Sequence, residues 1–133
     1  MTGLLPRREP VEPTADGPRV VSIGDGAEAV VEALRSETAR SVLCALYEEP
    51  TVASTLADRV ETSAQNVHYH LGRLRTAGLV EVAGTWYSEK GVEMDVYAPT
   101  GDPLVLAAGC EERVRALREA VAGADGDGGA VDR

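Results

Sequence analysis

The sequence predicts an α+β domain in which short helices come first and a pair of strands follows. Apolar residues recur at helical spacing over residues 27–74, and apolar and polar residues alternate over residues 92–97. Glycine, proline and short polar runs separate these segments. With 133 residues, of which 44% are hydrophobic, the chain can bury one core. We therefore expect a single small domain.

Both ends of the chain are too polar and too rich in glycine and proline to join that core. Residues 1–18 have few large apolar side chains and predict a disordered arm, and residues 123–133 (GADGDGGAVDR) predict a disordered tail. Between them we expect the folded domain over residues 19–109 and a separate C-terminal helix over residues 110–122.

Several classes of protein are not indicated. The chain has no apolar run long enough to cross a bilayer and no signal-peptide layout at its start, so we expect a soluble cytoplasmic protein. Its two cysteines, Cys44 and Cys110, are too few for a disulfide scaffold. Paired carboxylates, a nucleophile elbow and a phosphate-cradling glycine loop are all missing from the sequence, so we expect no enzyme and no cofactor.

The first elements follow from local patterns. Residues 19–23 (RVVSI) are a β-branched run typical of an edge strand, and a helical stripe covers residues 27–34. Ser36 is the natural cap of a second helix, which Pro50 ends. The side chains expected to face inward along that second helix are Ala39, Val42, Leu43, Leu46 and Tyr47, with Cys44 in the core.

The stretch from Thr62 to Val80 reads TSAQNVHYHLGRLRTAGLV and predicts the central helix of the domain. Ser63 is a natural N-cap, and Gly78 supplies the left-handed residue that stops the helix. One face carries Val67, Leu71 and Leu74 at helical spacing, and the other carries Gln65, Asn66, His68, Tyr69 and Arg73.

A short helix over residues 52–60 precedes that stretch, and a hairpin follows it. Two helices joined by the brief turn at Glu61 and Thr62 are a helix-turn-helix. Strands are expected at residues 79–87 and 92–98, because Val92, Met94 and Val96 alternate with Glu93, Asp95 and Tyr97. A helix-turn-helix followed by a hairpin is a winged helix-turn-helix.

The C-terminal part adds a segment and a helix to that domain. Residues 102–108 (DPLVLAA) favour a strand, although Asp-Pro is equally able to start a helix. The following helix has a narrow apolar seam of the coiled-coil kind. We expect this seam to form a homodimer interface, with packing on its own domain as the alternative; its members are Cys110, Val114, Leu117 and Val121.

The formal net charge of −9 is unusual for a protein that binds nucleic acid. Residues 62–80, however, contain no Asp or Glu, so the acid lies elsewhere. Among the 13 basic residues only Lys90 is a lysine. Acid excess with almost no lysine suggests a proteome adapted to high salt.

The ordered set of helix residues resembles the ArsR-type winged helix-turn-helix of prokaryotic regulators. Ser63, Val67, His70-Leu71, Leu74 and Ala77 to Val80 match that family's recognition helix in place, and the likeness covers roughly residues 26–99. The flanks SETARSVLCALYEE and TWYSEKGVEMDVYAP resemble those of haloarchaeal members. The resemblance implies a dimeric, sequence-specific transcription regulator that binds double-stranded DNA.

Two departures from that family bear on the chemistry. The first helix of the motif usually has a capping box, and here Val52 and Thr55 occupy its positions, which leaves Thr51 as a cap one residue early. Metal-sensing members carry paired cysteines in that helix, where this chain has Leu56-Ala57-Asp58. We therefore expect no thiolate metal site there.

The candidate DNA contacts lie on the polar face and at the wing. Gln65 and Asn66 have amides that can pair with adenine, and His68 can touch a base. His70 and Trp86 are expected to pack rather than to bind. The full set of candidate contacts is Thr62, Ser63, Gln65, Asn66, His68, Tyr69, Arg73 and Lys90, the last a phosphate contact or an ordinary turn residue.

Two other functions remain open at this level. One is a winged helix that binds proteins of the transcription machinery, which an acidic chain tolerates better. The other is a redox-sensing regulator in which Cys110 meets its symmetry mate near a two-fold axis and forms a disulfide, although an inert thiol is the commoner case. The sequence identifies no small-molecule effector.

The composition makes one prediction about solution behaviour. If the acidic surface is an adaptation to high salt, the fold remains intact on transfer to molar KCl. Circular dichroism melts recorded from low to molar salt measure this, and loss of the helical signal at molar salt would contradict the adaptation.

Overall fold

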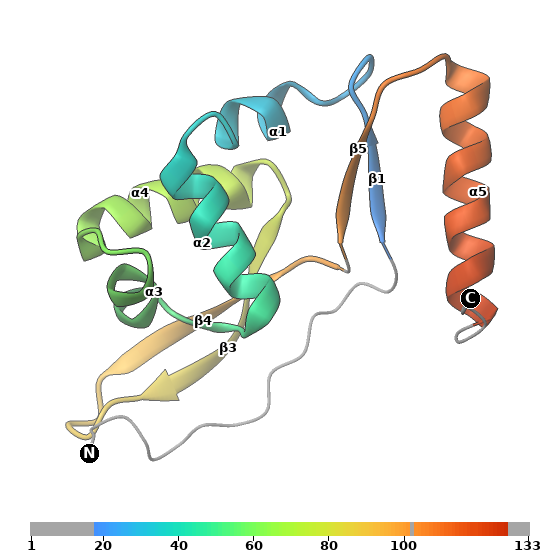
Figure 1. The fold of residues 1–133 in the computed structure, drawn as a ribbon. Coiled ribbons are helices and arrows are strands. Elements are labelled where there is room, and N and C mark those ends of the chain that lie inside the picture. Colours follow the sequence, from blue (N-terminus) through green and yellow to red (C-terminus); the bar gives the residue numbers. More distant parts are fainter. Residues whose placement is uncertain (1–17, 102, 128–133) are drawn as a thin grey trace.

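A computed structural model describes residues 18–101 and 103–127; the predicted arm, apart from residue 18, and the last residues of the predicted tail lie outside this range. The predicted α+β winged helix-turn-helix, with its added strand and C-terminal helix, is confirmed (Figure 1). In chain order the elements are β1 (Arg19–Ser22), α1 (Glu28–Ala33), α2 (Glu37–Glu48), β2 (Thr51–Val52), α3 (Ala53–Arg59), α4 (Ala64–Thr76), β3 (Val80–Tyr87), β4 (Glu93–Pro99), β5 (Leu104–Ala107) and α5 (Glu111–Asp127).

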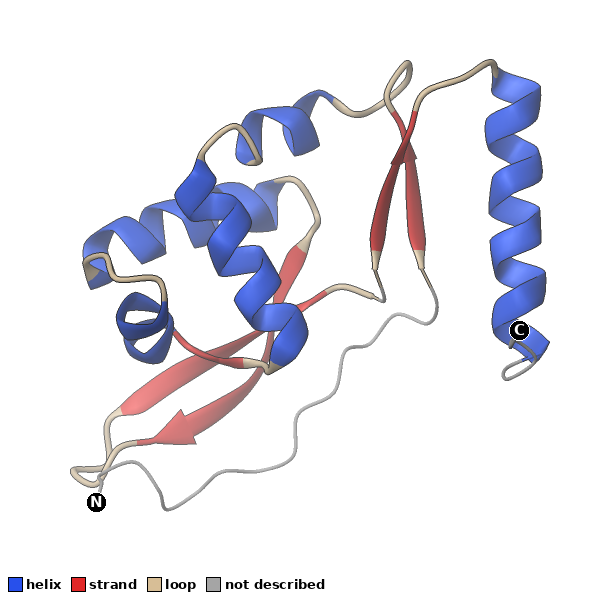
Figure 2. Cartoon of the chain, in the orientation of Figure 1, coloured by secondary structure: helices blue, strands red, loops and turns tan. Residues whose placement is uncertain are grey.

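The strands form two separate sheets (Figure 2). The first is antiparallel with the order β2-β4-β3, and its β3–β4 hairpin is the wing. The second pairs β1 with β5 in parallel, with Val20 opposite Val105. Residues 104–107 are thus a strand, and the two ends of the domain meet in one small sheet.

The main core lies between the four helices and the inner end of the wing. Its completely buried leucines come from three helices: Leu46 from α2, Leu56 from α3 and Leu74 from α4. A second, smaller cluster joins Val52, Trp86 and Val96, with Met94 against it. Trp86 therefore packs within the wing, as expected.

Helix α4 ends in the arrangement that its sequence predicts. Its C-cap is Ala77, and Gly78 has a φ of 77°. The amide of Leu79 donates to the carbonyl of Leu74 at 2.9 Å, and that of Gly78 donates to Arg75 at 2.9 Å, which together form a Schellman motif. The side chains of Arg19 and Thr100 both donate to the Gly78 carbonyl, so β1 and the end of β4 hold this turn.

The start of α3 differs from the prediction. Thr51 does not cap the helix; it belongs to β2, opposite Tyr97, and Val52 is an N-cap without a side-chain bond. A strand of two residues has too short a pattern to be recognised in the sequence. Ser36 does cap α2 as expected, accepting from the amide of Ala39 at 3.3 Å.

Three side chains differ in exposure from the prediction. Tyr97 was expected on the polar side of the hairpin, yet it is buried in the main core, while its neighbour Val96 on the opposite face of β4 is buried in the smaller cluster. Cys44 was expected in the core and is exposed. One residue turns a helix by about 100°, which carries Cys44 away from Leu43 and out of the buried arc. Tyr47 lies at the edge of that arc and is also exposed.

The C-terminal helix is longer than predicted. It continues past the expected end at Ala122 to Asp127, although the glycines and aspartates of this extension are weak helix formers. Arg118 of α5 donates to the carbonyl of Val20 in β1 at 3.2 Å, so the helix lies against the small sheet. Within the described part of the chain, no helix is both long and apolar enough to span a membrane.

Two glycines near the end of α4 give a matched pair of stability predictions. Gly78→Ala destabilises the fold by about 1–2 kcal/mol, because alanine is strained at a positive φ. Its Cβ also approaches an Arg19 nitrogen to 3.3 Å. Gly72→Ala stabilises it by about 0.5–1 kcal/mol, because Gly72 is helical and its Cβ would meet open space. Urea unfolding measures both, and effects of the same sign would contradict this account.

Candidate nucleic-acid interface

Helix α4 has one buried face and one exposed face. Val67, Leu71 and Leu74 pack into the core, and the opposite side of the helix is open to solvent. Both faces follow from the helical period, because burying the apolar stripe turns the polar residues outward. The exposed side chains of α4 beyond Ala64 are Gln65, His68, Tyr69, Arg75 and Thr76, with Gly72 between them.

The first turn of α4 is held by two hydrogen bonds that involve side chains. The Ser63 hydroxyl accepts from the amide of Asn66 at 3.0 Å, and the Asn66 side-chain amide donates to the Thr62 hydroxyl at 3.0 Å. Asn66 is therefore half-buried and oriented by its neighbour. Gln65 is exposed and makes no hydrogen bond within the described residues, so its amide is free to bind a partner.

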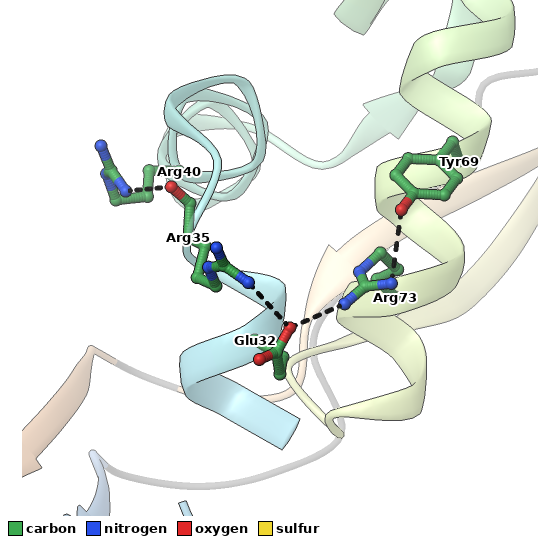
Figure 3. Close-up of polar contacts among 5 residues, drawn as sticks. All are labelled: Glu32, Arg35, Arg40, Tyr69 and Arg73. Carbon is green, nitrogen blue, oxygen red and sulfur yellow. Dashed lines mark hydrogen bonds and ion pairs between the residues drawn. The ribbon is translucent and has the colours of Figure 1, made fainter. Parts of the chain in front are cut away.

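Arg73 lies on the flank of α4 that faces α1. Its guanidinium reaches Glu32 of α1 at 3.4 Å and lies 5.7 Å from the centre of the Tyr69 ring (Figure 3). It also donates to the Tyr69 hydroxyl at 3.3 Å. Arg73 and Tyr69 thus form one unit. The ion pair of Arg73 with Glu32 was not foreseen, and the predicted role of Arg73 as a phosphate contact remains a prediction.

The other flank of α4 faces the wing. His68 lines a shallow hollow together with Ser54 of α3 and with Glu93 and Asp95 of β4. Lys90 is exposed in the turn of the wing, where its amide donates to the Ser88 hydroxyl at 3.2 Å. The only lysine of the chain therefore belongs to a hairpin that carries more acidic than basic side chains.

Arg75 lies on this same flank. It is exposed and forms no ion pair within the part of the chain that the structure describes. Burial raises the pKa of Tyr97, and Asp95 raises it further, whereas the positive charge of Arg75 lowers it. Arg75 therefore gives this flank of α4 an unpaired positive charge.

His70 is on the inner side of α4 and is buried, which confirms the expected packing role. Its ring meets that of Tyr69 edge-on, with 5.0 Å between the ring centres. Burial, followed by the nearby charge of Arg73, holds the pKa of His70 below its ordinary value of 6.5. Nδ1 of His70 has no hydrogen-bond partner among the described residues, so burial disfavours the charged form of the imidazole.

The predicted dimer seam divides into a buried and an exposed part. Val114 is 4% exposed in the single chain, so it holds α5 to its own domain. Leu117 is exposed, Val121 is half-buried, and Cys110 is an exposed free thiol. Among residues 18–101 and 103–127, no three His, Cys, Asp or Glu side chains are grouped to hold a metal ion.

Three charged residues beside the interface were not identified from the sequence. Glu32 pairs with Arg73 and also lies 3.6 Å from Arg35, and Arg40 donates to the carbonyls of Leu34 and Arg35. Glu32 and Arg73 are 41 positions apart in the chain. A local pattern carries no signal for such a pair.

Known proteins resemble this chain at the level of the motif. A family model described as a helix-turn-helix domain matches residues 34–83, which include α2, α3 and α4. No protein of curated function matches the chain.

Solved structures resemble the chain at the level of the fold. A homodimeric winged helix-turn-helix DNA-binding domain from Mycobacterium bovis, called a possible ArsR-family transcriptional regulator, is 18% identical with a TM-score of 0.47, over 84% of this chain and 91% of that one. NolR from Sinorhizobium fredii is 19% identical with a TM-score of 0.46, over 76% and 85%. Reduced HlyU from Vibrio cholerae is 24% identical with a TM-score of 0.46, over 76% and 90%. At this level of likeness, function has to be argued from the interface itself.

The lowered pKa of His70 predicts how stability depends on pH. The unfolded chain takes up a proton near pH 6.5, whereas folded His70 does so only at lower pH. The contribution of neutral His70 to the free energy of unfolding is therefore fully present above about pH 6.5, and it is lost as the pH falls from there through the lowered pKa.

Urea unfolding at a series of pH values measures this loss of stability. The loss is expected to be smaller in His70→Gln, which has no imidazole to titrate at this position. His68→Gln, at an exposed position on the same helix, serves as the control and retains the loss. Equal pH dependence in wild type and His70→Gln would contradict the assignment.

Proposed function

We propose that this chain is a sequence-specific DNA-binding transcription regulator that acts as a homodimer. Helix α4 enters the major groove, and the β3–β4 hairpin lies beside it as the wing. The observation that carries the proposal is the exposed face of α4, which is polar and free of carboxylates in a chain with a net charge of −9.

The shape and chemistry of α4 suit the major groove. A helix with its side chains is about 10–12 Å wide, and the groove is about 12 Å wide. The amides of Gln65 and Asn66 can each donate to and accept from adenine, and His68 can reach a neighbouring base. Because Gln65 is free and Asn66 is oriented by Thr62, Gln65 is the stronger candidate for base reading.

The phosphate contacts surround this base-reading centre. The capped start of α4 has no acidic residue in its first turn, so its partial positive charge is available to a phosphate. Thr62 and Ser63 lie at that end, Arg73 and Tyr69 on the α1 flank, and Lys90 at the wing tip. Arg75 joins this set from the wing flank.

The acidic balance of the whole chain limits binding that does not depend on sequence. Long-range repulsion from the acidic surface weakens general attraction to DNA, whereas direct contacts at α4 are preserved. The same surface keeps the protein hydrated at high salt, which is consistent with an origin in a salt-adapted organism. Affinity then has to come from close, well-fitted contacts.

A second copy completes the proposed regulator. Two recognition helices about 34–36 Å apart would enter successive major grooves on one side of the duplex. The exposed Leu117 and half-buried Val121 on α5 offer an apolar strip to a symmetry mate. Cys110, at the start of the same helix, would lie near that contact and would make it sensitive to oxidation.

A protein-binding winged helix is the rival function. A helix that docks on a protein has no reason to exclude Asp and Glu, whereas a helix that faces phosphates does. Residues 62–80, which comprise α4 and its flanking turns, contain neither Asp nor Glu. This difference favours DNA as the partner.

Selection from a pool of random duplexes tests the proposed function. Wild type enriches one sequence motif, and Gln65→Ala and Asn66→Ala each lose about 1–3 kcal/mol of discrimination at a base pair of that motif. Thr38→Ala, a neutral polar position near the start of α2, is the control and selects the wild-type motif. A wild type that enriches nothing, or a Gln65→Ala/Asn66→Ala variant that selects the same motif equally well, would refute the proposal.

A further inference from the structure

Two guanidinium groups from different elements converge on one carboxylate oxygen beside α4. Oε1 of Glu32 lies 3.4 Å from Nη2 of Arg73 and 3.6 Å from Nη1 of Arg35 (Figure 3). These three side chains line a surface hollow with Ser36, Tyr69 and His70. We call these six residues the Glu32 cluster.

The framework of the cluster is ordered by contacts of its own. The Arg40 guanidinium donates to the carbonyl of Leu34 at 2.6 Å and to that of Arg35 at 3.1 Å, which fixes the turn between α1 and α2. The Arg73 guanidinium lies over the Tyr69 ring. Arg35 and Arg73 are therefore presented to the same point from two sides.

Two guanidiniums around one oxygen are the arrangement that recognises an oxyanion. In this structure a carboxylate of the same chain supplies that oxygen. The three side chains are 41%, 54% and 72% exposed for Arg73, Glu32 and Arg35. Ion pairs this exposed are weak, so an incoming anion can displace the carboxylate.

We propose that the Glu32 cluster is a subsite for a backbone phosphate of DNA, and that Glu32 occupies it in the free protein as an internal competitor. This inference rests on the proposed function and adds Arg35 and Glu32 to it. Tyr69 belongs both to the exposed face of α4 and to the cluster, so a duplex that receives α4 brings one strand's phosphates to this flank.

The exchange has a defined electrostatic cost. When a phosphate takes the place of the Glu32 carboxylate, Arg35 and Arg73 keep an anionic partner, but Glu32 loses both cations. It must then recruit a cation from solution, which offsets part of the counterion release that drives DNA binding. Glu32 therefore lowers affinity without touching a base.

The test compares two isosteric substitutions on α1 in the full chain. Glu32→Gln removes the competitor, and Glu28→Gln removes an exposed carboxylate that has no ion pair within the described residues. Both change the net charge equally, so their difference isolates the local effect. Fluorescence anisotropy with the duplex selected by wild type gives the dissociation constants over a range of salt concentrations.

We expect Glu32→Gln to bind roughly three- to tenfold more tightly than Glu28→Gln, since two weak ion pairs no longer compete. The Glu32 carboxylate competes with a backbone phosphate whatever the base sequence of the duplex. The substitution therefore raises the affinity for random and for selected duplexes by the same factor. In an Arg73→Gln background, Glu32→Gln raises the affinity for DNA much less, because one of the two guanidinium groups for which Glu32 and the phosphate compete is gone.

Glu32→Gln binding no more tightly than Glu28→Gln overturns the inference, and so does an undiminished gain in the Arg73→Gln background. Both results require a wild type that selects its duplex, so they leave the proposed function standing. A wild type that binds no duplex refutes the proposed function, and the inference falls with it.

Discussion

The rest of the structure depends on the burial of one face of α4. Val67, Leu71 and Leu74 are at most 1% exposed, and they meet leucines from α2 and α3 in the main core. A helix held along one face has no freedom to rotate, so its other face is fixed in space. The Schellman turn at Gly78 then leads directly into the wing, which places the hairpin beside that exposed face.

Charge is distributed around α4 in a way that the net charge conceals. The helix itself has only basic and neutral side chains, yet both of its flanks meet carboxylates, from Glu32 on α1 and from Glu93 and Asp95 on the wing. Acidic groups near a DNA-binding face reduce attraction to any phosphate chain. Specific contacts are affected less, so in the proposed complex with DNA this arrangement would favour discrimination between sequences over affinity.

Local patterns predicted most of the fold, because helix caps, apolar stripes and the Gly78 stop act over a few residues. Ser36, Ser63 and Gly78 stand where the pattern places them. Features that depend on distant partners were missed or misjudged. Tyr97 is buried because the main core covers its side of β4, and the Arg73–Glu32 pair, which was not foreseen, forms because α1 lies beside α4. Neither fact is encoded near the residue concerned. The base-reading candidates Gln65 and His68 remain predictions, because exposure alone does not identify a partner.

The central claim is that α4 of each of two protomers lies in the major groove. Dimethyl sulfate footprinting on the selected duplex tests it most directly, because the reagent methylates guanine N7 in the major groove and adenine N3 in the minor groove. The account predicts guanine N7 protection in two segments separated by about one helical turn. Protection of adenine N3 alone, or a single protected segment, would contradict it.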